Sequence, residues 1–356
     1  MLRTDLRFTA GQETFSSYLL PGERVRTPSL VLLHYAQAAP LDHSLGVRAH
    51  NLWRDLIRRH YTPEGEYPVA ASCGGLCTLN ASAQIRSVQA IGERNLSRPG
   101  HGLNAWWVDA GWWEGFSKPS GWWPDNPDGY YNCSLGDWAP DPQLYPDGLK
   151  PVADAVHAAG LRMMLWFEVE RACNGTQLAA QHPSWILQDP SFCIQGYGLL
   201  NLGNPQARAW IEDRVSTLIA ASGIDHYRQD MNFDPLSFWQ HHDTPGRSGM
   251  TEAAYITGKY AYLDTLKARF PQLTIGGCAG GGRETDIEAM RRTQINSRAD
   301  VFCADDAQCS QGETYSLSLW VPRHGQSAAT GIFEPDGNIQ TDYAFRSFMS
   351  TSMAFW

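Results

Sequence analysis

The stretch Gly223-Ile224-Asp225-His226-Tyr227-Arg228-Gln229-Asp230-Met231-Asn232 decides the fold, because a short strand opens here onto polar groups. Gly223 follows a long helical pattern and suits the position just after a helix. Arg228, Asp230 and Asn232 alternate at the strand period, so we expect their side chains on one face. Such groups are stable inside a sheet only when they pair with one another or bind a ligand. At the carboxyl end of a strand in a parallel barrel they would face a ligand site. The structural alternative is an Arg–Asp ion pair that closes a loop.

Strands and helices alternate on both sides of this stretch. Further strands are predicted at 67–72, 105–109, 162–167, 273–277, 297–302 and 330–333. Helical patterns separate them, chiefly at 48–61, 149–159, 204–221 and 251–270. This order predicts a parallel α/β architecture. A doubly wound sheet would usually carry GxGxxG after its first strand, and Cys73-Gly74-Gly75-Leu76 does not match. A TIM (β/α)8 barrel is therefore expected.

The barrel is expected over residues 48–356, truncated near strand 8. Residues 353–356 stand where an eighth strand would begin. Residues 1–47 carry predicted strands at 14–20 and 29–35, which we interpret as the remnant of an N-terminal β-sandwich domain and a linker. An incomplete eighth strand would leave an unpaired edge on the first strand. We therefore expect residues 1–356 alone to be poorly soluble and inactive.

Composition narrows the possible functions. The 356 residues carry a net charge of −9, which argues against a nucleic-acid partner. No apolar run approaches the roughly twenty residues of a membrane span, so no membrane partner is expected. Arg3, Asp5 and Arg7 interrupt the N-terminus, so a signal peptide is not predicted and a cytoplasmic location is favoured. The 14 Trp residues suit carbohydrate recognition, although Trp also fills cores.

No metal or other cofactor is expected. The eight cysteines lack zinc-finger spacing. His241-His242-Asp243 is a weak candidate for metal ligands, but it is better interpreted as a solvated loop.

Six short motifs follow one another along the chain: Trp106–Trp112, Gly136–Trp138, Trp166–Arg171, Tyr227–Asn232, Cys278–Arg283 and Arg298–Asp300. Together, and in this order, they resemble the α-galactosidases of glycoside hydrolase family 36. The resemblance covers roughly residues 48–356. It implies a retaining exo-glycosidase that hydrolyses terminal α-galactosides through a covalent glycosyl-enzyme.

The resemblance also implies the two catalytic carboxyl groups, with Asp230 as the nucleophile and Asp300 as the general acid/base. A retaining glycosidase needs one ionised and one protonated carboxyl group, about 5–5.5 Å apart. Arg228 would keep Asp230 ionised, whereas burial and the nearby acidic pair Asp305-Asp306 would raise the pKa of Asp300. Asp305 and Asp306 are the rival acids, and Asp300 is preferred because it fits the motif.

The same motifs imply the substrate contacts: Asp109, Trp112, Trp138, Arg228, Asn232, Cys278 and Gly280. The alternative role of Asp109 is structural, as a cap of the next loop. Trp112 and Trp138 either stack on the sugar or pack the loop. Glu168 and Glu170 are expected to be hydrogen-bonding supports, not catalysts.

The sequence departs from the family pattern at three positions near these motifs. Arg228 stands where the family has Lys, Gly280 where many members have Ser, and Gln229 replaces an aromatic residue. An α-N-acetylgalactosaminidase or a galactosyl-transferring relative therefore stays an alternative, as does a non-catalytic carbohydrate-binding fragment. The expected partner is an oligosaccharide or glycoside substrate, and a homo-oligomeric full-length protein is left open.

Overall fold

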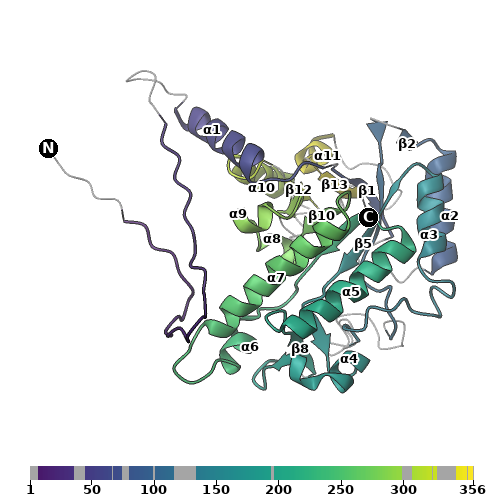
Figure 1. The fold of residues 1–356 in the computed structure, drawn as a ribbon. Helices are drawn as coiled ribbons and strands as arrows, with labels where there is room; N and C mark the ends of the chain where they lie inside the picture. Colours follow the sequence, from purple (N-terminus) through teal and green to yellow (C-terminus); the bar gives the residue numbers. More distant parts are fainter. Residues whose placement is uncertain are drawn as a thin grey trace.

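The computed structural model describes residues 7–35, 45–65, 67–73, 80–98, 101–115, 134–193, 196–298, 307–322, 324–326, 342–350 and 352–355. Eight parallel strands form a closed barrel in this part of the chain (Figure 1). In chain order they are β1 (Val69–Ser72), β4 (Ala105–Val108), β5 (Arg162–Phe167), β9 (His226–Gln229), β10 (Thr274–Gly277), β11 (Ile295–Ser297), β12 (His324–Gln326) and β13 (Ser352–Phe355). Each strand pairs with its neighbours in chain order, and β1 pairs with β13 to close the ring. The predicted (β/α)8 architecture is confirmed.

The closure of the barrel corrects one expectation from the sequence. β1 pairs with β4 on one side and with β13 on the other, where Val69 lies opposite Met353 and Ala71 opposite Phe355. The expectation of an unpaired edge on the first strand is therefore wrong. Four residues near position 353 are enough to complete the ring, because strands at this end of the barrel are only three or four residues long.

Two other strand positions differ from the sequence expectations. The sixth barrel strand is β11, which begins two residues earlier than predicted, and the predicted residues 299–302 lie outside the described part. The seventh strand is β12, at His324–Gln326, whereas the predicted residues 330–333 lie outside the described part.

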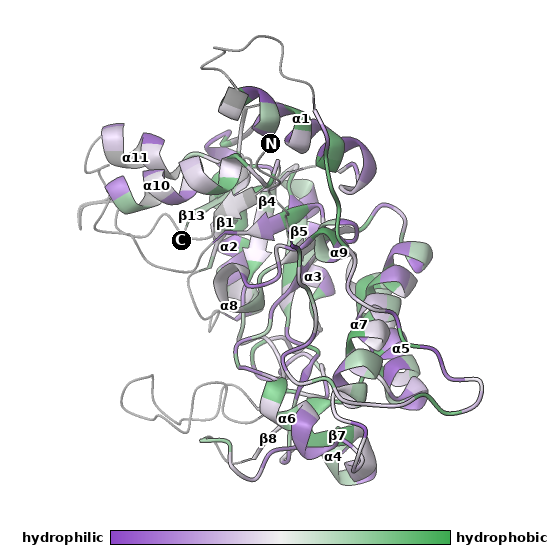
Figure 2. Ribbon diagram, turned by 90° about the vertical axis from the view of Figure 1, so that its left-hand side faces the viewer, coloured by the Kyte–Doolittle hydropathy of each residue, from purple (hydrophilic) through white to green (hydrophobic). Residues whose placement is uncertain are grey.

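Long helices connect the strands and pack on the outside of the barrel (Figure 1). They are α1 (Leu45–His60), which precedes β1, and then α2 (Ala81–Glu93), α3 (Lys150–Ala158), α5 (Pro205–Ser222), α7 (Met250–Arg269), α10 (Ala307–Ser318) and α11 (Asp342–Phe348). Shorter helices are α4 (Gln177–Gln181), η2 (Pro183–Trp185), α6 (Leu236–His241), α8 (Ala279–Gly282) and α9 (Ile287–Met290). The mixed hydropathy along α5 and α7 in Figure 2 fits helices that bury one face.

Helix α5 shows how local sequence sets the entry to β9. The Asn204 side chain accepts hydrogen bonds from the backbone N–H groups of Gln206 and Ala207, and Pro205 occupies the first turn. At the other end, Gly223 adopts φ 74°, a left-handed conformation that favours glycine. The chain then turns directly into β9, as the sequence predicted.

A small antiparallel sheet lies beyond the carboxyl end of β5. Its strands, in the order β6-β8-β7, are β6 (Arg171–Cys173), β8 (Tyr197–Leu200) and β7 (Ile186–Gln188). Contacts of Phe192 with Phe238 of α6 and of Tyr197 in β8 with Phe233 join this sheet to the segment that follows β9. A separate hairpin, β2 (Ser97–Arg98) and β3 (His101–Gly102), precedes β4.

The N-terminal arm, residues 7–35, contains no named strand, so the strands predicted at 14–20 and 29–35 are not formed. One isolated bridge, Ser16 to Ser248, is the backbone pairing found in these two segments. An extended segment becomes a strand only when a neighbour supplies a hydrogen-bonding ladder. Side-chain contacts hold the arm instead, including the ion pairs Glu23–Arg247 and Arg26–Glu288. Whether residues 1–47 belong to a separate β domain stays a prediction.

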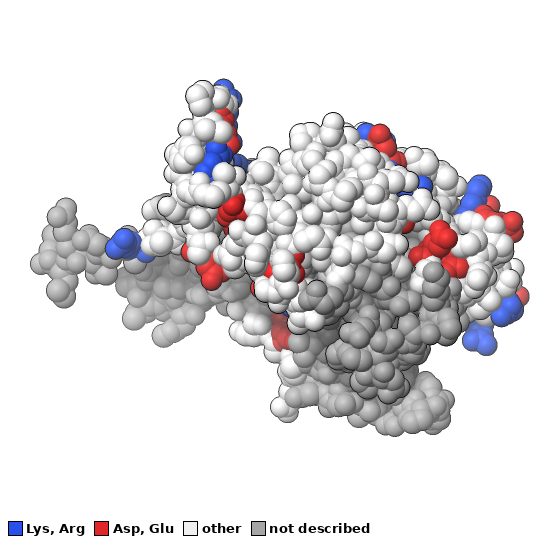
Figure 3. All heavy atoms as spheres, turned by 90° about the horizontal axis from the view of Figure 1, so that it is seen from below, with Lys and Arg blue, Asp and Glu red and all other residues white. Residues whose placement is uncertain are grey.

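Two features of the surface bear on partners. Among the described residues, no helix is both long and apolar enough to cross a membrane. On the face drawn in Figure 3, Lys and Arg are interspersed with Asp and Glu over the described part.

Candidate active site

Asp230 lies at the carboxyl end of β9 and is surrounded by hydrogen-bond donors. Its Oδ2 accepts from Trp166 Nε1 at 2.9 Å and from Asn232 Nδ2 at 2.9 Å. Its Oδ1 accepts from the backbone N–H groups of Met231 at 2.8 Å and Gly280 at 3.0 Å. The side chain is nearly buried, with 6% of the residue exposed. Four donors on one buried carboxylate stabilise its ionised form.

The electrostatics of Asp230 follow from this arrangement. Burial by itself would raise the pKa of Asp230. The charge of Arg228 and the hydrogen bonds from Asn232, Gly280 and Trp166 outweigh burial, so the pKa lies below its ordinary value. Asp230 is therefore a carboxylate near neutral pH. This state suits a nucleophile or an electrostatic partner, and it does not suit a proton donor.

Asn232 links Asp230 to a second buried carboxylate, Glu168. Its Nδ2 donates to Glu168 Oε2 at 2.9 Å as well as to Asp230, and its backbone N–H donates to Glu168 Oε1 at 3.0 Å. Glu168 also pairs with Arg171 at 2.5 Å. Burial raises the pKa of Glu168, the Arg171 charge opposes that rise, and the Asp230 charge adds to it.

Glu170 connects β9 to helix α7 through hydrogen bonds and an ion pair. Its Oε1 accepts from Gln229 Nε2 at 3.1 Å and lies 2.8 Å from Lys259 Nζ, while its Oε2 accepts from Tyr255 at 3.0 Å. Lys259 comes from α7 and also contacts Glu284. Glu168 and Glu170 thus both act as hydrogen-bonding supports in this structure, as the sequence suggested.

The loop after β10 supplies the Gly280 donor. Ala279, Gly280, Gly281 and Gly282 all have positive φ values, from 55° to 125°. A Cβ on Gly282 would lie 2.5 Å from the carbonyl oxygen of Ser297. The three glycines therefore allow a tight turn that aims a backbone N–H at the Asp230 carboxylate.

Three other residues predicted to contact the substrate, Arg228, Asp109 and Cys278, lie in a barrel strand or directly after one. Arg228 is buried inside the barrel, with its guanidinium carbon 5.0 Å from the centre of the Trp107 ring. Asp109 follows β4 and accepts from the N–H of Ala110 at 2.8 Å, which is the loop-capping role. Cys278 is buried, and its Sγ accepts from the N–H of Gly281 at 3.4 Å.

Trp112 and Trp138 lie in a packed aromatic cluster. Their ring centres are 5.8 Å apart, and both rings also contact Phe167. Trp112 is fully buried and donates through Nε1 to the carbonyl oxygen of Trp166 at 2.9 Å. Trp138 is 2% exposed. These contacts support the alternative that the two rings pack the loop beneath the site.

The general acid predicted from the sequence, Asp300, and its rivals Asp305 and Asp306 lie outside the described residues. Their distances from Asp230 therefore stay predictions. Among the residues that the structure does describe, no group of three or more His, Cys, Asp or Glu side chains is arranged to hold a metal ion.

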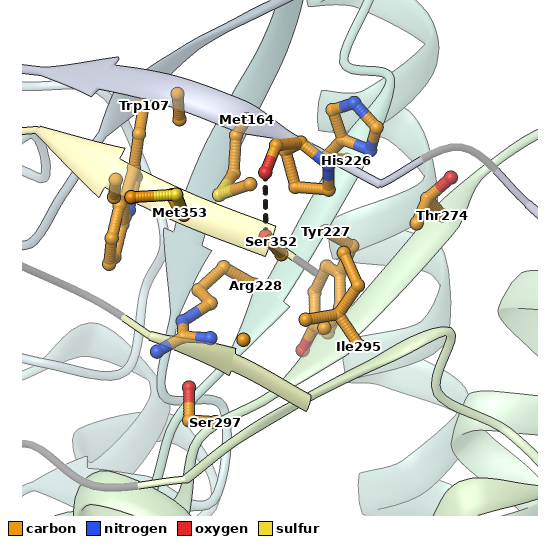
Figure 4. A pocket seen from close by; sticks show the side chains of 15 residues that line it. Trp107, Met164, His226, Tyr227, Arg228, Thr274, Ile295, Ser297, Ser352 and Met353 are labelled. Atoms are coloured by element: carbon orange, nitrogen blue, oxygen red, sulfur yellow. Dashed lines mark hydrogen bonds between the residues drawn. The ribbon is translucent and has the colours of Figure 1, made fainter. Parts of the chain in front are cut away.

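A cavity inside the barrel lies toward the amino ends of the strands (Figure 4). Trp107, Met164, His226, Arg228 and Thr274 are among the residues that line it. Its volume is about 30 Å³, room for roughly two water molecules and too small for a sugar ring. Asp230 lies at the opposite, carboxyl-terminal face of the barrel, which is where active sites of this fold lie.

Sequence reasoning missed three donors to Asp230, namely Trp166 and the backbone N–H groups of Met231 and Gly280. Trp166 is the penultimate residue of β5, and the strand period places its side chain on the inner face, two residues before Glu168. That spacing was a usable signal. The Gly280 donor is a backbone group, and its direction depends on φ and ψ values that a run of glycines leaves open.

The family model and the similar proteins that comparison finds are all of the α-galactosidase type. The family model described as Melibiase matches residues 42–332. The chain is 35% identical over 182 residues to a probable α-galactosidase C of Aspergillus flavus, covering 48% of this chain and 23% of that protein. It is 26% identical over 322 residues to the α-galactosidase AgaA of Geobacillus stearothermophilus, covering 87% of this chain and 41% of that protein.

The solved structures agree with the fold. A crystal structure of AgaA in complex with raffinose superposes with a TM-score of 0.69 at 21% identity, covering 86% of this chain and 41% of the other. The related AgaB structure, also from Geobacillus stearothermophilus, gives a TM-score of 0.71 at 20% identity over the same shares. The chain spans less than half the length of these relatives.

Proposed function

The chain belongs to the Melibiase family of α-galactosidase-like glycoside hydrolases, family 36, and from this premise we propose that it hydrolyses terminal α-galactosides with retention of configuration. In this proposal Asp230 attacks the anomeric carbon and forms a covalent galactosyl-enzyme. Water then releases the sugar in a second displacement at the same carbon.

The observation that carries the proposal is the environment of Asp230. A nucleophilic carboxylate must be ionised while it is largely shielded from water. The Arg228 charge and the hydrogen bonds from Asn232, Gly280 and Trp166 lower the pKa of Asp230 despite its burial. Its place at the carboxyl end of a barrel strand is where active sites of this fold lie.

The second carboxyl group of the mechanism is proposed to be Asp300. It follows β11 by three residues in the sequence and fits the last family motif. It would protonate the leaving group in the first step and then deprotonate the attacking water. Asp109, Arg228, Asn232, Cys278 and Gly280 are proposed to contact the sugar.

An oligosaccharide with a terminal α-galactosyl group is the proposed substrate. Structures of AgaA variants were solved with raffinose and with stachyose. By family membership we propose the same substrate class for this protein, with removal of one terminal sugar at a time.

The stereochemistry of the first product tests the mechanism. With the full-length protein and nitrophenyl α-galactoside, proton NMR should show α-galactose as the first sugar released, before mutarotation. The β-galactoside and α-N-acetylgalactosaminide serve as parallel substrates and should be cleaved poorly. Release of β-galactose from the α-substrate would contradict retention, and preference for either parallel substrate would contradict the proposed specificity.

A further inference from the structure

The side-chain amide of Asn232 connects two carboxylates. Its Nδ2 lies 2.9 Å from Asp230 Oδ2 and 2.9 Å from Glu168 Oε2. An amide nitrogen carries two hydrogens, so these two bonds use both of them. Both oxygens also accept from a second donor, Asp230 Oδ2 from Trp166 and Glu168 Oε2 from Arg171, so each acts as an acceptor. The nitrogen of the amide must therefore face both carboxylates, and its oxygen must face away from them.

Glu168 holds Asn232 at two points at once. One carboxylate oxygen accepts from the backbone N–H at 3.0 Å, and the other accepts from the side-chain amide at 2.9 Å. These two bonds fix the side chain relative to its own backbone. A hydrogen-bond donor at the position of either Glu168 oxygen would oppose one of them.

Glu168 is itself immobilised within the protein. It is fully buried, and it pairs with Arg171, which is 2% exposed. The Arg171 guanidinium carbon lies 4.9 Å from the centre of the Tyr197 ring and 5.8 Å from that of Phe233. Strand β8 and the segment after β9 thereby anchor the ion pair. Side chains locked in this way can define the geometry of a catalytic group.

We propose that Glu168 is a positioning residue, which sets the orientation of the Asn232 amide and through it the orientation of the Asp230 carboxylate. This proposal rests on the proposed function, in which Asp230 is the nucleophile. Among the described residues, no hydrogen bond joins Glu168 to Asp230 directly, and the hydrogen-bonded path between them runs through Asn232.

A double-mutant cycle on the full-length protein tests this coupling. Glu168→Gln replaces one acceptor by a donor and should lower kcat/KM by about 10- to 100-fold, mostly through kcat. Asn232→Ala removes the bridging amide. In the Asn232→Ala background, Glu168→Gln should change kcat/KM by less than about threefold, because the group through which it acts is gone.

Glu170→Gln is the matched control. Glu170 lies in the same segment after β5, is 2% exposed and contacts neither the Asn232 amide nor the Asp230 carboxylate in the described structure. The fold-change in kcat/KM of the double variant Glu170→Gln, Asn232→Ala should equal the product of the fold-changes of the two single variants. If the losses in kcat/KM caused by Glu168→Gln and Asn232→Ala also multiply in the double variant, Glu168 is a general stabiliser and the proposal is overturned. If Glu168→Gln fails to fold, the same cycle is run with Glu168→Asp, which keeps a negative charge facing Arg171.

A measurement without turnover separates this proposal from the proposed function. The side-chain NH2 protons of Asn232, followed by NMR, should exchange slowly with water in the wild type and in Glu170→Gln. They should exchange rapidly in Glu168→Gln. Equal exchange in all three proteins would overturn the positioning role. Absence of turnover on every α-galactoside, with the exchange pattern intact, would instead overturn the proposed function.

Discussion

At the residue scale, the Asp230 carboxylate is a buried charge that the protein stabilises with groups from β5 and from the segments after β9 and β10. Trp166 comes from β5, Asn232 from the segment after β9 and the Gly280 N–H from the loop after β10. The alternation of Arg228, Asp230 and Asn232 predicted one part of this set. The other donors could not be predicted with the same certainty, because they depend on the register of neighbouring strands and on backbone direction.

Gly282 tests the loop that positions the Gly280 N–H. It has φ 125°, and a Cβ would lie 2.5 Å from Ser297 O and 2.8 Å from Arg298 O. We expect Gly282→Ala to destabilise the protein by about 3 kcal/mol or more in urea unfolding and to reduce activity. Gly148 also has positive φ, 71°, but open space around it. Gly148→Ala should therefore cost only about 1–2 kcal/mol. Equal costs at the two positions would show that the loop is free to adjust.

His226 makes stability depend on pH. Its two ring nitrogens have no hydrogen-bond partner among the described residues, and the ring lines the cavity inside the barrel. Burial lowers the pKa of His226 to about 4; Asp225 opposes this shift, and Arg162 adds to it. Between pH 6.5 and 4 the unfolded chain binds a proton that the folded protein does not. The stability is thus fully present above pH 6.5 and falls as the pH drops through this window.

This loss should amount to about 3 kcal/mol at pH 4, at 1.36 kcal/mol for each pKa unit. His226→Gln removes the titrating group. Urea unfolding between pH 4 and 7 should therefore show a shallower acid slope for the variant than for the wild type. Parallel slopes would mean that the ring is protonated in the folded protein.

At the element scale, helices were predicted better than the later strands. Asn204, Pro205 and Gly223 marked both ends of α5 by chemistry that acts within a few residues. β11 and β12 have three residues each, Ile295-Asn296-Ser297 and His324-Gly325-Gln326, with little apolar character. Such strands form because their neighbours in the barrel pair with them. Their own residues therefore give only a weak strand signal in the sequence. The N-terminal arm shows the reverse case, since strands were predicted at 14–20 and 29–35 but no neighbouring strand pairs with these segments among the described residues.

Substitution of Lys259 in α7 tests how the helices around the barrel support the site. It is 4% exposed and lies 2.8 Å from Glu170, and it also pairs with Glu284. Burial would lower the pKa of Lys259, but the two carboxylates reverse this and raise it. Lys259→Met would leave Glu170 buried without its cation, so we expect a loss of about 3–5 kcal/mol in urea unfolding.

Two further variants qualify that result. Lys259→Met combined with Glu170→Gln should recover much of the loss, because the buried charge is gone. Lys150→Met, which breaks the exposed pair with Asp154, should leave stability almost unchanged. A similar small effect at Lys259 would mean that the buried network does not stabilise the fold.

At the scale of the whole molecule, the barrel is closed and its carboxyl-terminal face carries the Asp230 centre. The order of alternating strands and helices predicted this architecture, and the family motifs predicted where along it the chemistry lies. The closure could not be predicted, because the last strand consists of only four residues, Ser352–Phe355. Its pairing with β1 depends on contacts between residues almost 300 positions apart.

We propose Asp230 as the nucleophile of a retaining α-galactosidase. Trapping the glycosyl-enzyme tests it most directly. The full-length protein is treated with a 2-fluorinated galactosyl fluoride, digested and examined by mass spectrometry. We predict one sugar adduct, on the peptide that contains Asp230, and no adduct in the Asp230→Asn variant. An adduct on a different carboxylate, in a protein that turns over α-galactosides, would show that Asp230 is not the nucleophile.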